Sequence, residues 1–353
     1  MEIRLLTTPD DLARYDRWVK SHPDGTLWQS LEWKQFQESL GRTVKIYAAM
    51  EGAEIQASAL VVIDRTTGGL RTWEVPRGPL GRMENGEWRM ENLISLIIED
   101  ARKDHCISVY LSPSVPFSIL HSPLSISGRY VMPEATRILD LTLSDDDLLA
   151  QMKPKGRYNI GLAQRHGVRV ERSENFRAYA ALAEQTARRD GFQGHSGTFY
   201  KHFLSDLPGS FLLLAYPNSE SDLKPIAGLL GVVWGMQDLP ADLSPEAPRA
   251  KGEAPAGAKV GIYYYGASGN EHRELMAPYL LQWKAMQYCQ AQGCTSYDLF
   301  GIAPDGQPDH PWAGVSEFKS KFGGQVINYP PEEEITLRPF AKNLLKMKRK
   351  IIG

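Results

Sequence analysis

Cysteine is scarce in this sequence: Cys106, Cys289 and Cys294 are the only three among 353 residues. The last two do not form a CxxC pair and no histidines cluster near them, so the spacing suits neither a disulfide framework nor a zinc site. Free cysteines are among the most often buried residues of proteins. We therefore expect three reduced, buried thiols, and we predict no metal site.

Long hydrophobic runs are also missing. No stretch approaches the roughly 20 apolar residues of a membrane-spanning helix, and residues 1–6 (MEIRLL) lack the apolar core of a signal peptide. Both absences lead us to expect a cytoplasmic protein. The formal net charge is only −2, so any contact with nucleic acid or anionic lipid has to come from a local basic patch.

The remaining composition is that of an ordinary globular protein, with 42% hydrophobic and 23% charged residues. At 353 residues the chain is long enough for two domains with cores of their own. Helical and strand-like hydrophobic periods alternate along it. In the first part this pattern predicts helices at 9–21, 31–40 and 88–103, and strands at 45–50, 56–63, 72–75, 108–111 and 137–142.

Ser144, followed by three aspartates, predicts a helix N-cap that opens a second unit. The order of elements then repeats, which indicates a structural duplication without a residue-level repeat. The second set comprises helices at 156–165, 174–189, 198–206 and 277–291, and strands at 211–216, 226–234, 260–265 and 297–300. The predicted fold class is α/β (α+β), with domains 1–144 and 145–330, each a mixed, mainly antiparallel sheet flanked by helices.

Residues 238–259 are rich in proline, alanine and glycine and have no periodicity. This composition predicts a long, mobile hairpin loop within the second domain. A functional lid is the alternative, and we disfavour it because segments of such composition rarely order themselves.

Three consecutive tyrosines, Tyr263 to Tyr265, precede Gly266 at the end of a predicted strand. On a regular strand Tyr263 and Tyr265 share one face and Tyr264 takes the other. Two phenols on one face can line a pocket with flat walls and hydroxyl groups. The alternative is that aromatic residues simply favour strands.

Two later segments also carry polar groups among apolar ones. Asp298 lies near a strand end, where capping a turn is the favoured interpretation over chemistry. Lys319 and Lys321 lie between Phe318 and Phe322, where a lysine can stabilise an oxyanion or a phosphate. From chemistry alone, a solvated lysine pair on a turn is the simpler interpretation.

Four segments follow one another in the C-terminal part: Tyr-x-Tyr-Gly-Ala-Ser at 263–268, Ala-Pro-Tyr-x-x-x-Trp at 277–283, Tyr-Asp-x-x-Gly-Ile at 297–302 and Phe-Lys-x-x-Phe-Gly-Gly at 318–324. Three earlier ones accompany them: Trp-Gln-Ser-x-x-Trp at 28–33, Pro-Arg-Gly-Pro at 76–79, and Lys-x-Arg at 155–157 leading to Gly-Val at 167–168. In this combination, and over nearly its whole length, the chain resembles the FemABX family of peptidoglycan cross-bridge aminoacyltransferases. It resembles in particular the shorter, FemX-like members that lack a coiled-coil arm.

The resemblance implies two tandem acetyltransferase-like (GNAT-like) domains, in agreement with the duplication. It also implies transfer of an amino acid from aminoacyl-tRNA to the side-chain amine of a stem peptide, in UDP-MurNAc-pentapeptide or lipid II. The aminoacyl ester is already activated, so the acceptor amine needs mainly positioning and the loss of a proton. Aminoacyl-tRNA is a substrate, so we expect no cofactor, and we expect a monomer.

By the same resemblance Lys319 is the catalytic residue, which stabilises negative charge on the tetrahedral intermediate or on the departing ribose oxygen. The implied substrate-binding residues are Lys34, Arg77, Tyr263, Tyr265 and Phe318. Lys34 corresponds to the region that contacts the phosphates of the precursor, a task that a lysine performs as a point charge.

The chain departs from the family pattern at two substrate-binding positions. Ser112-Pro113 stands where the family often has Asp-Pro, and His195 stands near the place of a phosphate-binding arginine. These departures leave the acceptor open between another stem peptide, a lipid-linked precursor and an amine outside the cell wall.

The last residues, 338–353, are basic and contain no acid. One interpretation is a closing helix, in which residues 331–353 pack back on the first domain. The other is a basic amphipathic helix that touches the inner face of the membrane, and the two are compatible.

Two other functions remain open. An acyl-CoA-dependent GNAT-type acyltransferase would need a glycine-rich turn for the pyrophosphate, and residues 266–270 (GASGN) lack the usual pattern. A non-catalytic protein that binds tRNA or the precursor is the second alternative. It would use the basic cluster at 153–166, for which solvated helix-surface charges are the simpler interpretation.

Overall fold

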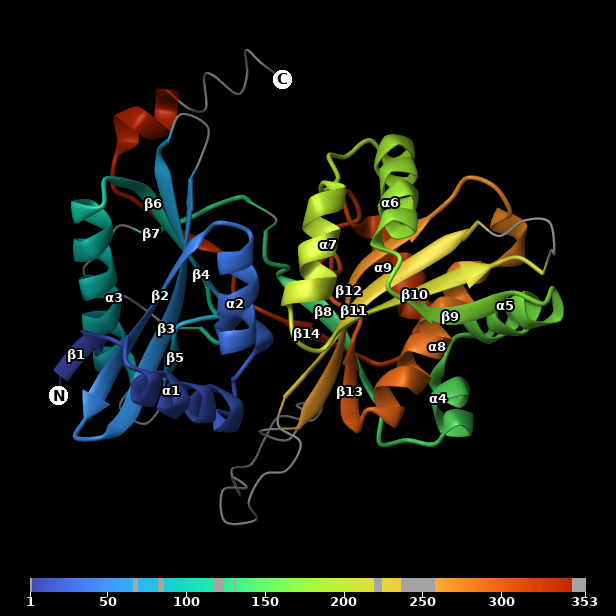
Figure 1. The fold of residues 1–353 in the computed structure, drawn as a ribbon, viewed down its shortest axis with the longest axis horizontal. Coiled ribbons are helices and arrows are strands. Elements are labelled where there is room, and N and C mark those ends of the chain that lie inside the picture. Colours follow the sequence, from blue (N-terminus) through green and yellow to red (C-terminus); the bar gives the residue numbers. More distant parts are fainter. Residues whose placement is uncertain are drawn as a thin grey trace. The chain divides into compact units, whose positions relative to one another are not determined.

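The computed structural model describes residues 2–65, 69–81, 86–116, 124–129, 131–218, 224–235 and 258–344, without the side chains of 86–89. The chain divides into two compact units (Figure 1). Unit 1 consists of Met1–Glu134 together with Tyr329–Gly353, and unit 2 of Ala135–Asn328. Most of the loop predicted at 238–259 and residues 345–353 of the basic C-terminal segment lie outside the described residues.

Unit 1 contains one sheet with the strand order β1-β2-β3-β4-β6-β15-β7, and β5 also pairs with β3. Its strands are β1 (Glu2–Leu5), β2 (Thr43–Glu51), β3 (Glu54–Arg65), β4 (Arg71–Pro76), β5 (Leu80–Gly81), β6 (Cys106–Ser112), β7 (Leu124–Ile126) and β15 (Glu333–Thr336). The pair β4–β6 is parallel, and the other pairs are antiparallel. The helices are α1 (Pro9–Ser21), the short 3₁₀ helix η1 (Leu27–Gln29), α2 (Leu31–Ser39) and α3 (Gly86–Lys103).

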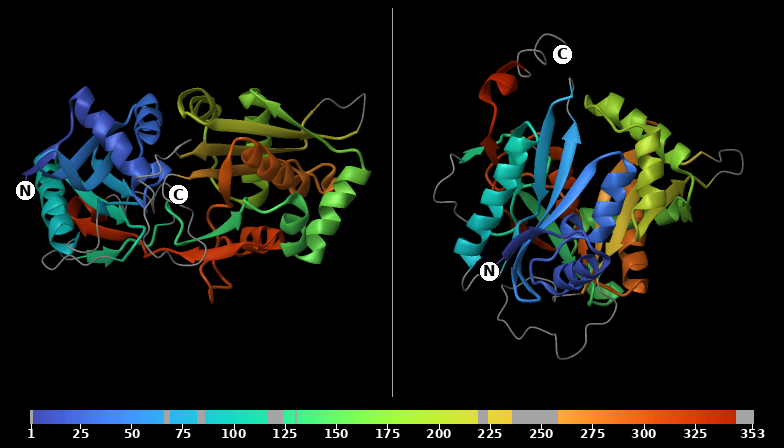
Figure 2. Two further views of the ribbon diagram at one scale, coloured as in Figure 1. Left: turned by 90° about the horizontal axis from the view of Figure 1, so that it is seen from below. Right: turned by 60° about the vertical axis from the view of Figure 1, so that its left-hand side comes forward.

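Helix α3 covers one face of this sheet, and α1 and α2 cover the other (Figure 2). Leu93, Ile94 and Ile97 recur at helical spacing, are fully buried, and pack against the sheet residues Trp73 and Val109. This apolar stripe is what predicted the helix, because residues three or four apart share one face.

The side chain of Gln29, at the end of η1, replaces part of the sheet ladder. The amide nitrogen Nε2 donates to the carbonyl of Pro76 (2.7 Å), and the amide oxygen Oε1 accepts from the backbone N–H of Leu60 (2.8 Å). Strand β3 pairs with β5 at Ser58 and with β4 from Val62 onward, so Leu60 lies between the two ladders. Gln29 thereby satisfies buried backbone groups that would otherwise lack partners.

Unit 2 contains a sheet with the order β14-β8-β13-β12-β11-β10-β9. Its strands are β8 (Ala135–Asp140), β9 (Arg169–Ser173), β10 (Ser210–Tyr216), β11 (Ala227–Trp234), β12 (Lys259–Ser268), β13 (Cys294–Asp298) and β14 (Gln325–Asn328). The pair β12–β13 is parallel and the others are antiparallel. The helices are α4 (Asp145–Gln151), α5 (Pro154–Arg165), α6 (Phe176–Asp190), α7 (Gly197–Asp206), α8 (Ala277–Ala291) and α9 (Ala313–Lys319), and the short 3₁₀ helices η3 (Arg273–Leu275) and η4 (Ser320–Phe322) precede α8 and follow α9.

The domain boundary differs from the one predicted after residue 144. Strand β8 was expected in the first domain, but Ser296 of β13 pairs with Asp140, and Gln325 of β14 pairs with Ile138. The strand therefore belongs to unit 2, which begins at Ala135. At the other end, β15 pairs with β6 and β7 of unit 1. The predicted N-cap of α4 is present, because the Ser144 side chain accepts from the backbone N–H of Asp147.

The three cysteines are free and buried, as the sequence predicts. In the described parts of the chain, no helix combines the length and the apolar character that crossing a membrane requires.

Replacement of Gln29 by methionine tests its part in unit 1. The substitution keeps the side-chain volume but leaves the Leu60 N–H and the Pro76 carbonyl buried without a partner, so we expect a loss of about 2–4 kcal/mol in the free energy of unfolding. Urea unfolding followed by tryptophan fluorescence measures it. Gln35→Met, on the exposed side of α2, is the control and should change stability by less than about 0.5 kcal/mol. Equal stability of both variants would show that the hydrogen bonds of Gln29 do not stabilise unit 1.

Candidate functional site

Strand β12 carries a β-bulge within its tyrosine segment. Leu230 of β11 pairs with Tyr265, whereas the next residue, Gly231, pairs with Tyr263, so Tyr264 is the extra residue. One extra residue reverses the alternation of faces along a strand. The prediction that Tyr263 and Tyr265 share a face is therefore wrong. Tyr263 packs against the core that contains α8, whereas the Tyr265 ring contacts three aromatic rings of α7.

Glycine at position 266 makes room for the Tyr263 hydroxyl. A Cβ atom at Gly266 would lie 1.8 Å from that oxygen, so any larger residue would displace the phenol. Burial raises the pKa of Tyr263 to about 12, although a hydrogen bond with Gln282 of α8 acts in the opposite direction. The hydroxyl therefore keeps its proton at neutral pH.

Lys319, the predicted catalytic residue, lies where the pairing of β12 with β13 ends. The last pair of this parallel ladder is Ile262 with Asp298. Just beyond it, Lys319 Nζ donates to the carbonyls of Phe300 (3.1 Å) and Gly301 (2.8 Å) and lies 5.2 Å from the centre of the Tyr263 ring. We call this place the β12–β13 opening; it is bounded by Tyr263, Phe300, Gly301 and Lys319.

The ammonium of Lys319 is buried, with 6% of the residue exposed. Burial lowers its pKa from 10.5 to about 7, and the nearby carboxylate of Asp298 partly opposes this shift. Removing a charge from water disfavours the charged form, which explains the direction. Near neutral pH the group is therefore present both as an ammonium and as a neutral amine, and pKa values of this kind are typical of functional sites.

Asp298 is held in place by hydrogen bonds from two sides. The backbone N–H of Phe300 donates to Oδ1 (2.7 Å), and the Thr136 hydroxyl of β8 donates to the same oxygen. The first bond forms the turn cap that the sequence analysis favoured. This turn also fixes the carbonyl of Phe300, which accepts from Lys319.

Tyr265 and His195 come together, as two of the predicted substrate-binding residues, on the α7 side of β12. The Tyr265 hydroxyl lies 3.1 Å from His195 Nε2. The imidazole stacks on Phe199 with ring centres 3.9 Å apart, and both rings contact Tyr200. The result is an aromatic cluster with polar groups at its edge, which is a common lining of ligand sites.

Phe318 precedes Lys319 in α9 and packs within unit 2. Its ring contacts Tyr279 of α8 (5.1 Å between ring centres) and Phe322 of η4 (5.2 Å). These contacts fix the orientation of the end of α9, so the structure assigns Phe318 a packing role beside the opening. Its predicted role in substrate binding stays a prediction.

In unit 1, Arg77 is buried between two aromatic rings. Its guanidinium lies 3.5 Å from the centre of the Tyr329 ring and 6.0 Å from that of Trp28, and Nη2 donates to the carbonyl of Pro133 (2.6 Å). Only 2% of the residue is exposed. These contacts join the Pro-Arg-Gly-Pro and Trp-Gln-Ser motifs, which lie far apart in the sequence.

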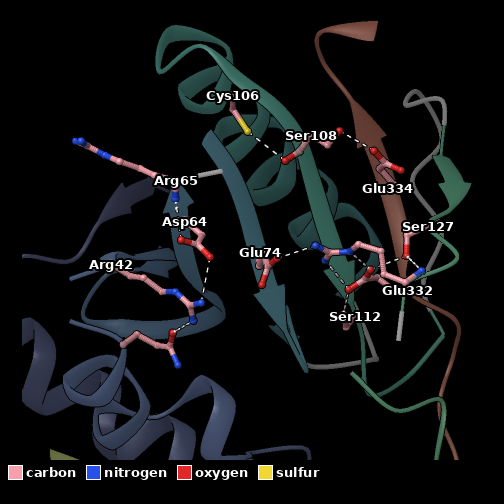
Figure 3. A network of polar contacts seen from close by, with 12 residues as sticks. Arg42, Asp64, Arg65, Glu74, Cys106, Ser108, Ser112, Ser127, Glu332 and Glu334 are labelled. Atoms are coloured by element: carbon pink, nitrogen blue, oxygen red, sulfur yellow. Dashed lines mark hydrogen bonds and ion pairs between the residues drawn. The ribbon is translucent and has the colours of Figure 1, made fainter. Parts of the chain in front are cut away.

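Ser112 belongs to a polar network on the sheet of unit 1 (Figure 3). Its hydroxyl donates to Glu332 Oε2 (3.0 Å), and the Ser127 hydroxyl donates to Oε1 of the same carboxylate (2.5 Å). Arg129 holds both oxygens of Glu332 (2.8 and 2.9 Å) and also binds Glu74 (2.8 Å). A carboxylate therefore lies beside Ser112 after all, but it belongs to Glu332, the residue before β15, and is already paired.

Lys34 lies on α2, where its Nζ pairs with Glu38 Oε2 at 2.6 Å, one helical turn away. An exposed pair of this kind contributes little stability, so Lys34 can exchange this partner for an anion. Among the described residues, no group of three or more histidine, cysteine or acidic side chains is arranged to hold a metal ion.

Sequence reasoning missed two residues that matter here. Gln29 lies inside the Trp-Gln-Ser motif, but its hydrogen bonds to the backbone of Leu60 and Pro76 were not predicted. Glu332 carried no signal at all, because it is one of three consecutive glutamates and its partner Ser112 lies 220 positions away.

Replacement of Lys319 by methionine tests the buried charge. Below about pH 7 the lysine is protonated in the folded and unfolded states, so burial destabilises the fold fully. Between pH 7 and 10.5 only the unfolded state binds the proton, and the penalty falls as pH rises. We expect Lys319→Met to stabilise the protein more at pH 6 than at pH 9, by about 3 kcal/mol in urea unfolding.

The control is Lys321→Met, two residues away. The ion pair with Glu317 raises the pKa of Lys321, so this substitution should have the same effect at both pH values. A pH-independent gain in Lys319→Met would show that Lys319 titrates as an ordinary lysine.

Comparison with known proteins identifies the family of this chain. The chain matches the FemAB family over residues 11–127, 119–228 and 257–348. It is 24% identical over 365 residues to the lipid II:glycine glycyltransferase of Staphylococcus epidermidis, and 88% of each chain is covered. It is 23% identical over 369 residues to the protein of the same name from Staphylococcus aureus, with 88% of this chain and 87% of that one covered.

Two solved structures show the same fold. The crystal structure of FemX has a TM-score of 0.73 at 20% identity and covers 98% of this chain and 99% of its own. A tandem GNAT protein from the clavulanic acid biosynthesis pathway has a TM-score of 0.54 at 13% identity, over 95% of this chain and 98% of its own. The expected fold of two GNAT-like units is thus confirmed, and with family matches along most of its length this chain belongs to the FemAB family.

Proposed function

We propose that this protein transfers an amino acid from aminoacyl-tRNA to the amine of a peptidoglycan precursor peptide. The observation that carries the proposal is Lys319 in the β12–β13 opening, with two carbonyls and a tyrosine ring around its ammonium. Relatives named lipid II:glycine glycyltransferases support the class of reaction. We propose the cytoplasmic side of the membrane as the place of action, because aminoacyl-tRNA is made there.

The proposed reaction forms one bond and breaks one. The acceptor amine attacks the ester carbonyl, a C–N bond forms, and the C–O bond to the ribose breaks. The amine loses a proton, and the ribose oxygen gains one. Negative charge develops on oxygen in the intermediate, where a preorganised cation in a site of low dielectric stabilises it strongly. Lys319, with two of its three donors fixed on carbonyls, is such a cation.

The connection between β12 and α8 favours this donor over acyl-CoA. In residues 269–276 the chain passes through η3. The residue before α8, Met276, has a left-handed backbone conformation and makes no side-chain capping hydrogen bond. A pyrophosphate site would need a tight glycine-rich turn that leads straight into the helix. The test below therefore includes acetyl-CoA as a competing donor.

The proposed acceptor is a lipid II or UDP-MurNAc-linked stem peptide. The roles of Lys34, Arg77, Ser112, His195, Tyr263, Tyr265 and Phe318 in binding substrates stay predictions. The arrangement around Ser112 affects which acceptor can bind. The charge of Glu332 is already neutralised by Arg129, so it attracts a positively charged acceptor group less than an unpaired aspartate would. Contact of the C-terminal segment with the membrane is proposed only as a complement: Phe340 and Leu344, 92% and 68% exposed, end the described part of it.

The decisive experiment supplies purified protein with radiolabelled aminoacyl-tRNA and a stem-peptide precursor. We expect transfer of label to the precursor, no transfer from acetyl-CoA, and a fall in kcat of about 10²–10³-fold in Lys319→Met, typical for loss of an oxyanion donor. Lys321→Met should remain active. Transfer from acetyl-CoA instead, or full activity of Lys319→Met, would overturn the proposal.

The pH dependence distinguishes charge stabilisation from proton abstraction. The ratio of the wild-type rate to the Lys319→Met rate cancels the ionisation of the acceptor amine. If the ammonium is the active form, this ratio shrinks as pH rises through the pKa of about 7. A ratio that grows with pH would instead identify Lys319 as a general base.

A further inference from the structure

Helix α5 concentrates positive charge on a chain with a net charge of only −2. Residues 148–170 contain five lysines and arginines and no aspartate or glutamate. Four of these cations, Lys153, Lys155, Arg157 and Arg165, belong to α5 or cap it, and all four are exposed. We call these four residues the α5 strip.

The strip occupies the solvent side of the helix. Gly156, Asn159, Ile160 and Ala163 form the buried side. On the exposed side Tyr158 is 60% exposed, and the Arg165 guanidinium lies 5.6 Å from the centre of its ring. The twelve residues of α5 extend over about 18 Å, enough for several charges of an extended polyanion.

Two of these cations, Lys153 and Lys155, lie at the N-terminus of α5, where positive charge is unfavourable for the helix itself. The positive end of a helix dipole favours acidic residues in the first turn, and α1 and α4 follow this rule with Asp10, Asp11 and three aspartates after Ser144. In α5 the first turn contains no acid, and the Lys153 side chain makes no capping hydrogen bond. Arg157 donates to the Met152 carbonyl at the end of α4, and Arg165 lies in the last turn of α5. Lys153 and Lys155 have no such benefit from the helix dipoles, and their presence indicates an anionic ligand.

The strip adjoins η4, the short helix that directly follows Lys319. The backbone N–H of Lys153 donates to the carbonyl of Lys321 (3.1 Å), and Lys153 Nζ donates to the Ser320 hydroxyl (2.9 Å). A Cβ atom at Gly156 would lie 2.4 Å from the Lys321 carbonyl, so α5 and η4 are in direct contact. Ser320 follows Lys319 in the chain, so the Lys153 end of the strip lies close to Lys319.

One acidic residue lies at this junction, and the neighbouring lysines lower its pKa. Glu317 of α9 is exposed and pairs with Lys321 at 2.9 Å. Its pKa is lowered first by Lys321 and further by Lys155 and Lys153. Three lysines therefore surround a single carboxylate.

The chemistry of the strip fits a nucleic acid better than a lipid surface. Among the described residues of unit 2, the large exposed hydrophobic side chains are Tyr158, Phe192 and Val315, and only Tyr158 lies on α5. A helix that enters a membrane interface carries an apolar face toward the lipid. Exposed cations beside one aromatic ring instead match a phosphate backbone with a base or ribose next to it.

We propose that the α5 strip binds the phosphate backbone of the donor tRNA and so directs its aminoacyl end toward Lys319. The identity of the RNA rests on the proposed function, whereas the binding of RNA phosphates rests on the strip alone. The experiment therefore measures RNA binding separately from amino-acid transfer.

The test uses the double variant Lys155→Glu/Arg165→Glu and uncharged tRNA as the probe. Removing two phosphate contacts should weaken binding about ten-fold or more and reduce the slope of log K against log salt by about 2. In the transfer assay, KM for aminoacyl-tRNA should rise by a similar factor while kcat is retained. An acid at position 155 favours the helix dipole, whereas an acid at position 165, in the last turn of α5, opposes it. The two effects offset each other, so the thermal unfolding midpoint should change little.

The control is Arg177→Glu/Lys201→Glu, which changes the net charge equally on α6 and α7; it should bind tRNA like the wild type. Equal tRNA affinity of the strip variant and the wild type would overturn the inference. So would intact tRNA binding together with lost binding to phosphatidylglycerol vesicles, which would assign the strip to lipid. If the strip variant loses tRNA binding but the wild-type protein transfers no amino acid, the proposed function is refuted, whereas the binding of RNA by the strip is supported.

Discussion

The separation of β12 from β13 beyond Ile262 and Asp298 is the constraint on which the candidate site depends. An ammonium enters a protein interior only where fixed dipoles replace its hydration shell. Here the carbonyls of Phe300 and Gly301 do so. They are available because the neighbouring backbone turns toward β8, where the Leu299 N–H donates to the Arg137 carbonyl (2.8 Å). Lys319 can therefore be buried without a directly paired carboxylate, and its pKa falls.

The two units handle buried polarity in different ways. In unit 1 a charged pair, Arg129 with Glu332, is closed by serines and by Glu74, so its hydrogen-bonding capacity is largely used. In unit 2 the buried cation at Lys319 keeps one donor in reserve and a pKa near neutrality. A buried network in which every polar group has a hydrogen-bond partner is stable and unreactive. A buried group with an unused donor lowers the stability of the fold but can still bind a substrate. This contrast supports the proposal that places the chemistry in unit 2.

Local patterns predicted local structure well. The apolar stripe of α3 and the Ser144 cap of α4 follow from spacings within one or two turns, and they were found as predicted. The bulge at Tyr264 could not be predicted, because it depends on how β11 pairs with β12 and not on either strand alone. Strand β8 was placed in the wrong unit for the same reason: periodicity identifies a strand but does not choose its neighbour. The carboxylate beside Ser112 was missed because the residue that supplies it, Glu332, lies 220 residues away in the sequence.

The return of β15 to unit 1 has a consequence for the order of folding during synthesis. Strands β6 and β7 are both completed by β15, whose residues Glu333–Thr336 come late in the chain. Until the ribosome has released them, β6 presents an unpaired edge, and such edges are prone to pair with the wrong partner. All of unit 2 lies within the preceding stretch of chain. The N-terminal unit is thus made first and finished last, and the nascent protein passes through a state in which only the unit carrying Lys319 has all its strands.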